Sequence, residues 1–218
     1  MSKLVIFDCD GVLVDTEAII RRTRVVLLRA LDIPAIEEDL IPMSGLSAPD
    51  SYASIAARYN VSLPDDIRER FRIEFDRQIH QGIPSIPGVT ELIDSLAVPF
   101  CVASNGGHRF MKTTLGAAQL YDKFSGHIFS AEGLPRPKPF PDIYLHAAEQ
   151  MGVQSGECIV IEDSIHGVTA GSSAGMEVIG FIGSGHQTRE TLVAAGAYTA
   201  CTDMGEIASE LKSCGLLK

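Results

Sequence analysis

The sequence predicts an α/β protein in which helices cover a parallel sheet, with a separate helical domain inserted after the first strand. From Pro87 onward, helical patterns alternate with short apolar runs rich in β-branched residues. Such alternation implies right-handed crossovers and a parallel sheet covered on both faces, as in Rossmann-like folds. Between about Asp15 and Ser85 helical patterns replace the β-branched runs. We therefore expect an α/β catalytic core formed by residues 1–14 and 86–218 and a helical cap domain formed by 15–85.

The first expected strand is the apolar run Lys3–Phe7, which Asp8-Cys9-Asp10-Gly11 follows at once. In an open α/β sheet, ligands bind at the carboxyl ends of the strands. Residues two apart on a chain that leaves a strand can point into one small volume. Asp8 and Asp10 are therefore candidates for a nucleophile and an acid/base, or for a shared metal site. The alternative is a solvated aspartate turn.

The segment after this strand shows apolar residues at helical spacing near 19–30 and 67–75. Breaks between its helices are expected at four prolines, Pro34, Pro42, Pro49 and Pro64. A helical domain inserted beside a catalytic strand end is well placed to act as a lid.

The remaining core elements follow as helix and strand in turn. The expected strands are Phe100–Ala103, Ile128–Phe129, Cys158–Ile161 and Val178–Ile182. The expected helices lie near 88–97, 108–120, 141–151, 165–175 and 188–195.

Three further polar clusters follow expected strands or open expected helices. Ser104-Asn105-Gly106-Gly107 offers a hydroxyl and backbone N–H groups for a phosphate, although Ser-Asn-Gly is also an ordinary turn. Glu162-Asp163-Ser164 offers carboxylates, or else only a helix N-cap. Lys138 is a lone cation in the proline-stiffened loop Arg136–Asp142, where a solvated lysine is the usual interpretation.

The four clusters together favour a functional site more strongly than any one alone, because each falls where an open α/β sheet places functional groups. Asp8, Asp10, Glu162, Asp163 and a phosphate in one place would repel by roughly 4 kcal/mol per close pair at an effective dielectric constant near 20. One lysine cannot neutralise that charge. Mg²⁺, which prefers carboxylate, carbonyl, water and phosphate oxygens, can do so.

Amino-acid composition limits which partners the protein can bind and indicates its cellular compartment. The net charge is -10 and no Lys/Arg cluster is present, which argues against nucleic acid and anionic membranes. The five cysteines show no C-x-x-C spacing, and we interpret them as reduced thiols. No apolar run approaches the ~18 residues of a membrane span. We expect a cytoplasmic monomer that acts on a small metabolite.

The four motifs together resemble those of haloacid dehalogenase-superfamily phosphatases, in the branch that contains beta-phosphoglucomutase and small sugar-phosphate phosphatases. They occur in the family's order, as Asp8-Cys9-Asp10-Gly11-Val12, Ser104-Asn105, Lys138-Pro139 and Glu162-Asp163. The helical insertion stands where that branch carries its cap. Pro137 departs from the family pattern, which usually has Gly before the lysine.

The resemblance implies a role for each motif residue. Asp8 would attack phosphorus to form an aspartyl phosphate, while Asp10 would protonate the leaving oxygen and then activate the hydrolytic water. Mg²⁺ would be held by Asp8, the Asp10 carbonyl and Asp163, with Glu162 binding it directly or orienting a metal-bound water. The phosphate oxygens would be bound by Ser104, the Asn105 amide and Lys138.

Within the superfamily, Asp10 favours phosphoryl transfer over dehalogenation. Mutases hold a second phosphate with cap-loop and post-motif residues, and the matching positions here are Ala48, Gly106 and His108. A His of the first cap helix is replaced by Ile20. Plain hydrolysis is therefore favoured over a beta-phosphoglucomutase-like transfer. A catalytically inactive phosphometabolite sensor is the alternative from another class, although no motif carboxylate is missing.

The substrate would be a small phosphorylated sugar or sugar acid. In the cap, the residues expected to contact the substrate are Thr16, Glu17 and the loop Ser44–Ser47. Arg21, Arg22 and Arg24 lie close together on the first cap helix, and successive residues fan around a helix. We expect at least one of these arginines to bind a carboxylate or phosphate of the substrate.

Overall fold

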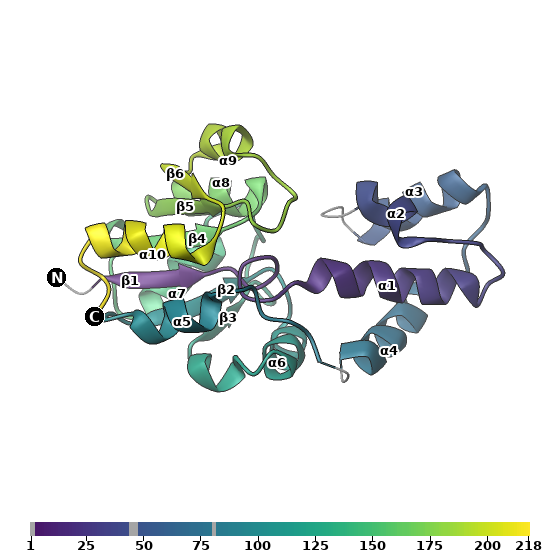
Figure 1. The fold of residues 1–218 in the computed structure, drawn as a ribbon, viewed down its shortest axis with the longest axis horizontal. Helices are drawn as coiled ribbons and strands as arrows, with labels where there is room; N and C mark the ends of the chain where they lie inside the picture. Colours follow the sequence, from purple (N-terminus) through teal and green to yellow (C-terminus); the bar gives the residue numbers. More distant parts are fainter. Residues whose placement is uncertain (1–2, 44–47, 80–81) are drawn as a thin grey trace. The chain divides into compact units, whose positions relative to one another are not determined.

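The computed structural model describes residues 3–43, 48–79 and 82–218. The chain divides into two compact units, Met1–Asp15 with Pro84–Lys218, and Thr16–Ile83 (Figure 1). Each unit has its own arrangement of secondary structure and is described by itself. None of the described helices combines the length and the apolar character needed to span a membrane.

The first unit contains a six-stranded parallel sheet with the order β3-β2-β1-β4-β5-β6. The strands are β1 (Leu4–Phe7), β2 (Phe100–Ser104), β3 (Ile128–Ser130), β4 (Cys158–Glu162), β5 (Glu177–Phe181) and β6 (Thr199–Cys201). The fully buried β1 lies between β2 and β4, and Ile6 is in register with Cys101 on one side and Val160 on the other. The α/β fold with a Rossmann-like parallel sheet is confirmed.

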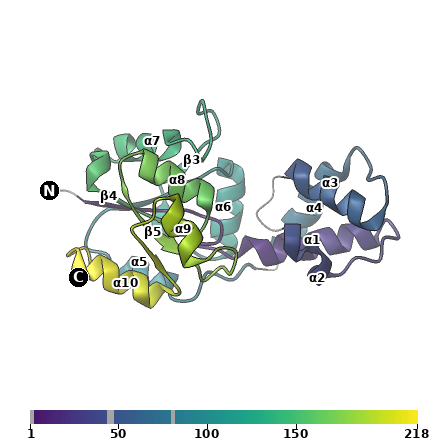
Figure 2. The same ribbon diagram turned by 90° about the horizontal axis from the view of Figure 1, so that it is seen from above.

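Helices cover both faces of this sheet, with α7 and α8 on one side and α5 and α10 on the other (Figure 2). The helices and 3₁₀ turns of this unit are α5 (Val89–Ser95), α6 (His108–Ala117), η2 (Tyr121–Phe124), α7 (Asp142–Gln150), η3 (Ser155–Glu157), α8 (Ile165–Ser173), α9 (Arg189–Ala195) and α10 (Met204–Ser213). Leu4 and Ile6 pack with Tyr144 and Val168 in one hydrophobic cluster, so alternate residues of β1 hold one helical layer against the sheet.

Two elements at the end of the chain, β6 and α10, were not among the expected ones. The strand β6 has the sequence Thr-Ala-Cys and lacks the large apolar side chains that mark the equally short β3. The start of α10 does carry a local signal, because Asp203 accepts a hydrogen bond from the backbone N–H of Glu206 at 2.9 Å. Glu206 in turn accepts from the N–H of Thr202 at 2.7 Å, so the two acidic side chains satisfy the exposed donors.

The second unit consists of helices, namely α1 (Thr16–Arg29), α2 (Glu37–Leu40), η1 (Ile41–Met43), α3 (Ala48–Tyr59) and α4 (Ile67–Ile79). Its core joins Val25 and Leu28 of α1 to Leu40 and Ile55. The break expected at Pro49 is wrong, because Pro49 is the second residue of α3. The first turn of a helix tolerates proline, whose missing N–H has no intrahelical acceptor there.

The two chain segments at the border of the α/β unit pair with each other. Val14 and Ser85 form an antiparallel bridge, and the Ile86 N–H donates to the Leu13 carbonyl at 3.0 Å. The N–H of Asp15 also reaches the carbonyl of Pro84 at 3.3 Å. This pairing fixes the loop after β1, in which Asp10 and Gly11 lie, against the segment that returns to the sheet.

Candidate active site

Asp8, Lys138, Glu162 and Asp163 meet as a buried charged group in the α/β unit. Asp8 follows β1, Glu162 is the last residue of β4, and Asp163 comes directly after it. Because β1 and β4 are parallel neighbours, their carboxyl ends lie at the same edge of the sheet. The solvated turn and the solvated lysine are therefore excluded for Asp8 and Lys138.

Lys138 lies at the centre of this group. Its Nζ is 2.5 Å from Asp8 Oδ1, 2.7 Å from Glu162 Oε1 and 3.0 Å from the Ala103 carbonyl oxygen. An ammonium group has three donors, and these three acceptors match them. Pro137 thus does not prevent Lys138 from reaching the strand ends.

The Asn105 side chain holds the loop that carries Lys138. Asn105 Oδ1 accepts a hydrogen bond from the Lys138 N–H at 2.9 Å, and Asn105 Nδ2 donates to the Lys138 carbonyl at 3.4 Å. Ser104 Oγ accepts from the N–H of Gly106 at 3.1 Å, so the turn expected after β2 is present. Asn105 therefore acts on the backbone of Lys138, a contact that the sequence spacing does not reveal.

Glu162 has both carboxylate oxygens occupied. Oε1 accepts from Lys138 and from the hydroxyl of Tyr144 at 2.9 Å, and Oε2 accepts from the N–H and the hydroxyl of Ser164, both at 3.0 Å. Ser164 is also the N-cap of α8, where its hydroxyl accepts from the Gly167 N–H. A Cβ atom at Gly167 would lie 1.6 Å from Glu162 Oε1, so only glycine leaves room for this carboxylate.

Tyr144 is the site residue that the sequence analysis missed. Its ring lies 4.7 Å from Lys138 Nζ, and its side chain is fully buried. On α7 it occupies a position that any large core residue of an amphipathic helix would take, and no motif distinguishes it. The proximity of α7 to the lysine loop was the only available signal.

Asp8, Glu162 and Asp163 each offer an oxygen atom, and these atoms lie within 4.8 Å of one another. Gly11 packs against this cluster in a left-handed conformation with φ of 85°. A Cβ atom at Gly11 would lie 2.0 Å from Asp163 Oδ2. The backbone of the loop after β1 therefore approaches Asp163 as closely as only glycine permits.

The electrostatics of the cluster indicate missing positive charge. Burial raises the pKa of Asp8 to about 7, against the opposing effect of Lys138. Burial also raises the pKa of Asp163 well above its usual range, with further contributions from the charges of Glu162 and Asp8. Burial acts to raise the pKa of Glu162 as well, but Lys138 outweighs it and lowers that pKa. One ammonium group thus compensates Glu162 and leaves the two aspartates poorly stabilised as anions.

The other predicted residues occupy separate positions. Asp10 lies half-buried in the loop after β1, and its charge helps to raise the pKa of both Asp8 and Asp163. Thr16 and Glu17 belong to the helical unit, in the first turn of α1. The expected loop Ser44–Ser47 lies outside the described residues.

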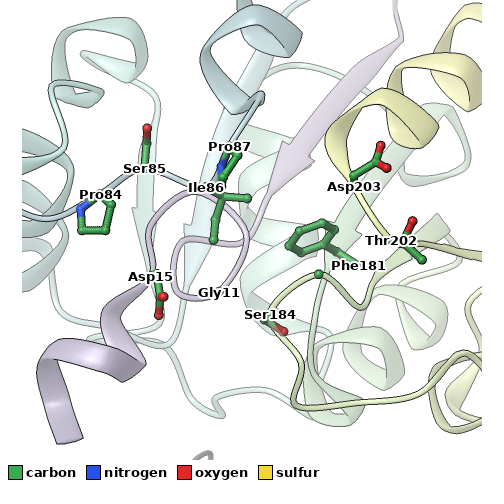
Figure 3. Close-up of a pocket in the computed structure, with 11 residues that line it drawn as sticks. Gly11, Asp15, Pro84, Ser85, Ile86, Pro87, Phe181, Ser184, Thr202 and Asp203 are labelled. Atoms are coloured by element: carbon green, nitrogen blue, oxygen red, sulfur yellow. The ribbon is translucent and has the colours of Figure 1, made fainter.

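A cavity of about 410 Å³ in the α/β unit lies beside the acidic cluster, since Gly11 borders both. Figure 3 shows the Phe181 ring between Ile86 on one side and Thr202 and Asp203 on the other, with Ser184 below it. The lining mixes apolar side chains such as Phe181 with polar ones such as Ser184 and Thr202, which suits a small polar molecule.

The Rossmann-like sheet and the buried lysine–carboxylate group at its carboxyl edge define an enzyme of the phosphoryl-transfer type. The chain belongs to the haloacid dehalogenase-like hydrolase family, whose sequence model matches residues 2–175. The expected family is thereby confirmed.

Several known proteins of similar sequence are phosphatases. The chain is 32% identical to 6-phosphogluconate phosphatase of Escherichia coli K12 over 190 residues, which cover 85% of this chain and 86% of that protein. It is 29% identical to hexitol phosphatase B of the same organism, covering 80% and 81% of the two chains. The chain is a phosphoric monoester hydrolase.

Solved structures agree with the fold. The crystal structure of a HAD family hydrolase from Deinococcus radiodurans, with bound phosphate and sodium, matches with a TM-score of 0.87 and 29% identity. The match covers 100% of this chain and 98% of that one. A putative beta-phosphoglucomutase from Thermotoga maritima matches with a TM-score of 0.83 and 26% identity over 97% and 99% of the two chains.

Proposed function

We propose that this protein is a Mg²⁺-dependent phosphatase that hydrolyses a small phosphorylated metabolite through an aspartyl-phosphate intermediate. The observation that carries the proposal is the contact of Lys138 with Asp8 and Glu162, beside Asp163, at the carboxyl edge of the sheet. This arrangement offers a nucleophilic carboxylate next to a fixed cation, and its three carboxylates outnumber that one ammonium group.

The residues present fit a magnesium ion. Hard oxygen donors are what Mg²⁺ prefers, and the Asp8 and Asp163 carboxylates with the Asp10 carbonyl would hold it. Glu162 already accepts four hydrogen bonds, so it serves better as the anchor of Lys138 than as a direct ligand. When bound, Mg²⁺ supplies positive charge that offsets the carboxylates and the substrate phosphate.

The chain's own residues account for the two chemical steps. A carboxylate oxygen of Asp8 forms a bond to phosphorus while the bond from phosphorus to the ester oxygen breaks, and protonated Asp10 gives its proton to that leaving oxygen. A water molecule then attacks the same phosphorus, and Asp10 accepts its proton. The bond between phosphorus and Asp8 breaks, which releases inorganic phosphate and restores the carboxylate.

Ser104, the backbone amide of Asn105 and Lys138 would bind the phosphate oxygens during both steps. Charge on these oxygens must be held in a largely dissociative transition state, so fixed donors accelerate the reaction. The Asn105 side chain contributes by holding the Lys138 backbone in place. To bind the phosphate, Lys138 would exchange one of its three present acceptors for a phosphate oxygen.

The names of two relatives, 6-phosphogluconate phosphatase and hexitol phosphatase B, support the proposed substrate class. We place this chain's substrate among sugar and sugar-acid phosphates. In this proposal the helical unit is the cap that closes over the substrate, and Thr16 and Glu17 contact the part of the substrate remote from phosphorus.

The direct test is the hydrolysis of p-nitrophenyl phosphate. We expect release of inorganic phosphate with Mg²⁺ present, no turnover in EDTA, and full recovery when excess Mg²⁺ is added back. A protein that is inert under both conditions would be a sensor rather than an enzyme. Conversion of a sugar phosphate into its positional isomer, without release of phosphate, would indicate a mutase.

The substitution Asp163→Asn distinguishes the effect of Mg²⁺ binding on stability from the effect of the buried charge itself. In EDTA we expect the Asp163→Asn variant to melt at a higher temperature than the wild type, because a buried like charge is removed. Added Mg²⁺ is expected to raise the melting temperature of the wild type but not of the variant. Differential scanning fluorimetry measures both effects, and an equal Mg²⁺ response in the two proteins would contradict the assignment.

The same measurement depends on pH in a defined direction. The pKa of Asp8 is about 7 in the folded protein and near 4 in the unfolded chain. The free energy of unfolding of the metal-free protein therefore falls as pH rises from about 4 to 7, because the buried side chain must lose its proton. Mg²⁺ binds the deprotonated carboxylates. The difference in melting temperature between Mg²⁺ and EDTA is therefore expected to grow across this range.

A further inference from the structure

Tyr144, on α7, is a buried titratable residue that takes no part in the two proposed chemical steps. Its side chain is fully buried in the hydrophobic cluster that also contains Leu4 and Ile6 of β1. Packing alone requires only an aromatic ring at this position, because a buried hydroxyl is unfavourable unless it forms a hydrogen bond. The contacts of the hydroxyl and of the ring therefore indicate what the tyrosine adds.

The hydroxyl of Tyr144 donates a hydrogen bond to Glu162 Oε1 at 2.9 Å, and the same oxygen accepts from Lys138 Nζ at 2.7 Å. Burial raises the pKa of Tyr144 well above its usual range, so the hydroxyl keeps the proton that it donates. The other carboxylate oxygen, Oε2, accepts from the N–H and the hydroxyl of Ser164. Both oxygens of Glu162 are thus fixed, and Tyr144 fixes the one that contacts Lys138.

The ring of Tyr144 restrains the ammonium group of Lys138 as well. Nζ lies 4.7 Å from the ring centroid, a distance at which a cation is attracted to an aromatic ring. This attraction is stronger where the charge is shielded from water, and the Lys138 side chain is only 4% exposed. A single residue therefore contacts the Lys138–Glu162 pair twice, once through its hydroxyl and once through its ring.

Lys138 depends on such restraint because its side chain is long and flexible, and it loses rotamer entropy when its head group is fixed. The Asn105 side chain holds the backbone of Lys138 through hydrogen bonds to its N–H and carbonyl. Tyr144 acts at the opposite end, directly on the ammonium group through the ring and indirectly through Glu162. The lysine is therefore held at both of its ends.

We propose that Tyr144 is a positioning residue, whose hydroxyl fixes Glu162 Oε1 so that this oxygen holds the Lys138 ammonium beside Asp8 and the transferred phosphoryl group. This inference rests on the proposed phosphatase function. Asp8 must turn an oxygen toward phosphorus, whereas Glu162 and the Ala103 carbonyl take part in no bond change. The donor that now contacts Asp8 is therefore the one that moves to a phosphate oxygen, while the contacts with Glu162 and Ala103 stay.

The substitution Tyr144→Phe tests this role, because it removes the hydroxyl and keeps the ring. We expect kcat for p-nitrophenyl phosphate in saturating Mg²⁺ to fall about 10-fold, as the loss of one hydrogen bond to a charged group supports. The Mg²⁺ concentration for half-maximal activity should stay within about twofold, because Tyr144 contacts Lys138 and Glu162 rather than the proposed metal ligands. An unchanged kcat would overturn the inference.

The matched control is Tyr59→Phe. Tyr59 also donates its hydroxyl to a carboxylate, that of Asp39 at 2.6 Å, but both residues belong to the helical unit. The control variant should keep kcat within about twofold of the wild type. Equal losses of kcat in the two variants would show that any lost tyrosine–carboxylate hydrogen bond has this effect, and would overturn the inference.

A double-mutant cycle with Lys138→Met distinguishes positioning from packing. If Tyr144 acts through Lys138, its hydroxyl has no ammonium group to position in that background. Tyr144→Phe should then change the rate by less than about twofold, and single-turnover measurements with excess enzyme extend to such slow variants. A further loss of about 10-fold in the Lys138→Met background would show that Tyr144 acts independently of Lys138, contrary to the inference.

The wild type alone tests the function on which this inference rests. A wild-type protein that fails to hydrolyse p-nitrophenyl phosphate in Mg²⁺ would show that the proposed phosphatase function is wrong, whatever the variants do. An active wild type together with an equally active Tyr144→Phe variant would leave that function intact and overturn only the role of Tyr144.

Discussion

Replacing Asp8 with asparagine is expected to lower kcat/KM for p-nitrophenyl phosphate by at least about 10⁴-fold. The carboxamide has no anionic oxygen that can form a bond to phosphorus, and it removes one metal ligand. The substitution is nearly isosteric, and it replaces a buried carboxylate whose pKa burial has raised to about 7. Steady-state kinetics in saturating Mg²⁺ measures the effect.

The control for Asp8→Asn is Asp122→Asn, the same change at an exposed position of the α/β unit. It should leave turnover unchanged. Circular dichroism and thermal melting of both variants would show that the fold is retained. An Asp8→Asn protein that is folded and as active as the wild type would rule out Asp8 as the nucleophile.

Replacing Lys138 with methionine is expected to affect both stability and activity. The substitution leaves Asp8 and Glu162 as buried carboxylates without their cation, a loss typically worth about 3–5 kcal/mol. In a chain of this length that corresponds to a decrease in melting temperature of roughly 10 °C in EDTA. Turnover should fall by about 10²–10³-fold, because a fixed donor to the transition state is lost.

The matched control for Lys138→Met is Lys123→Met. Lys123 also contacts an aspartate at 2.5 Å, but this pair with Asp94 lies at the surface, where an ion pair contributes only about 0–1 kcal/mol. The stability deficit of Lys138→Met should shrink at acid pH, where Asp8 and Glu162 take up protons. An equal, pH-independent effect of the two substitutions would contradict the buried lysine's role.

The sheet of the α/β unit could be predicted because each of its longer strands is an uninterrupted apolar run followed by polar residues. The order of elements from β1 to α9 follows from that alternation. The strand β6 was missed because its three residues include no large apolar side chain, unlike those of the equally short β3. The break expected at Pro49 was wrong because a proline that ends one helix can equally begin the next. Local pattern alone cannot separate these two cases.

The charged cluster was predictable for a different reason. Parallel topology brings the carboxyl ends of β1 and β4 together, so Asp8 and Asp163 had to approach each other once the sheet was assigned. The partners of Glu162 were not predictable, because the Tyr144 hydroxyl and the room left by Gly167 depend on how α7 and α8 pack. Which arginine of α1 is buried likewise depends on its contacts with Tyr52 and Phe71.

The most direct test of the central claim is to trap the phosphorylated carboxylate. In an Asp10→Asn variant the second step lacks its base, whereas p-nitrophenolate leaves without needing a proton. We expect one equivalent of p-nitrophenolate per enzyme in a burst. Borohydride reduction of the quenched protein should then convert Asp8 to homoserine, as mass spectrometry of the peptide would show. Absence of a burst, or an unmodified Asp8 after a burst, would contradict the account.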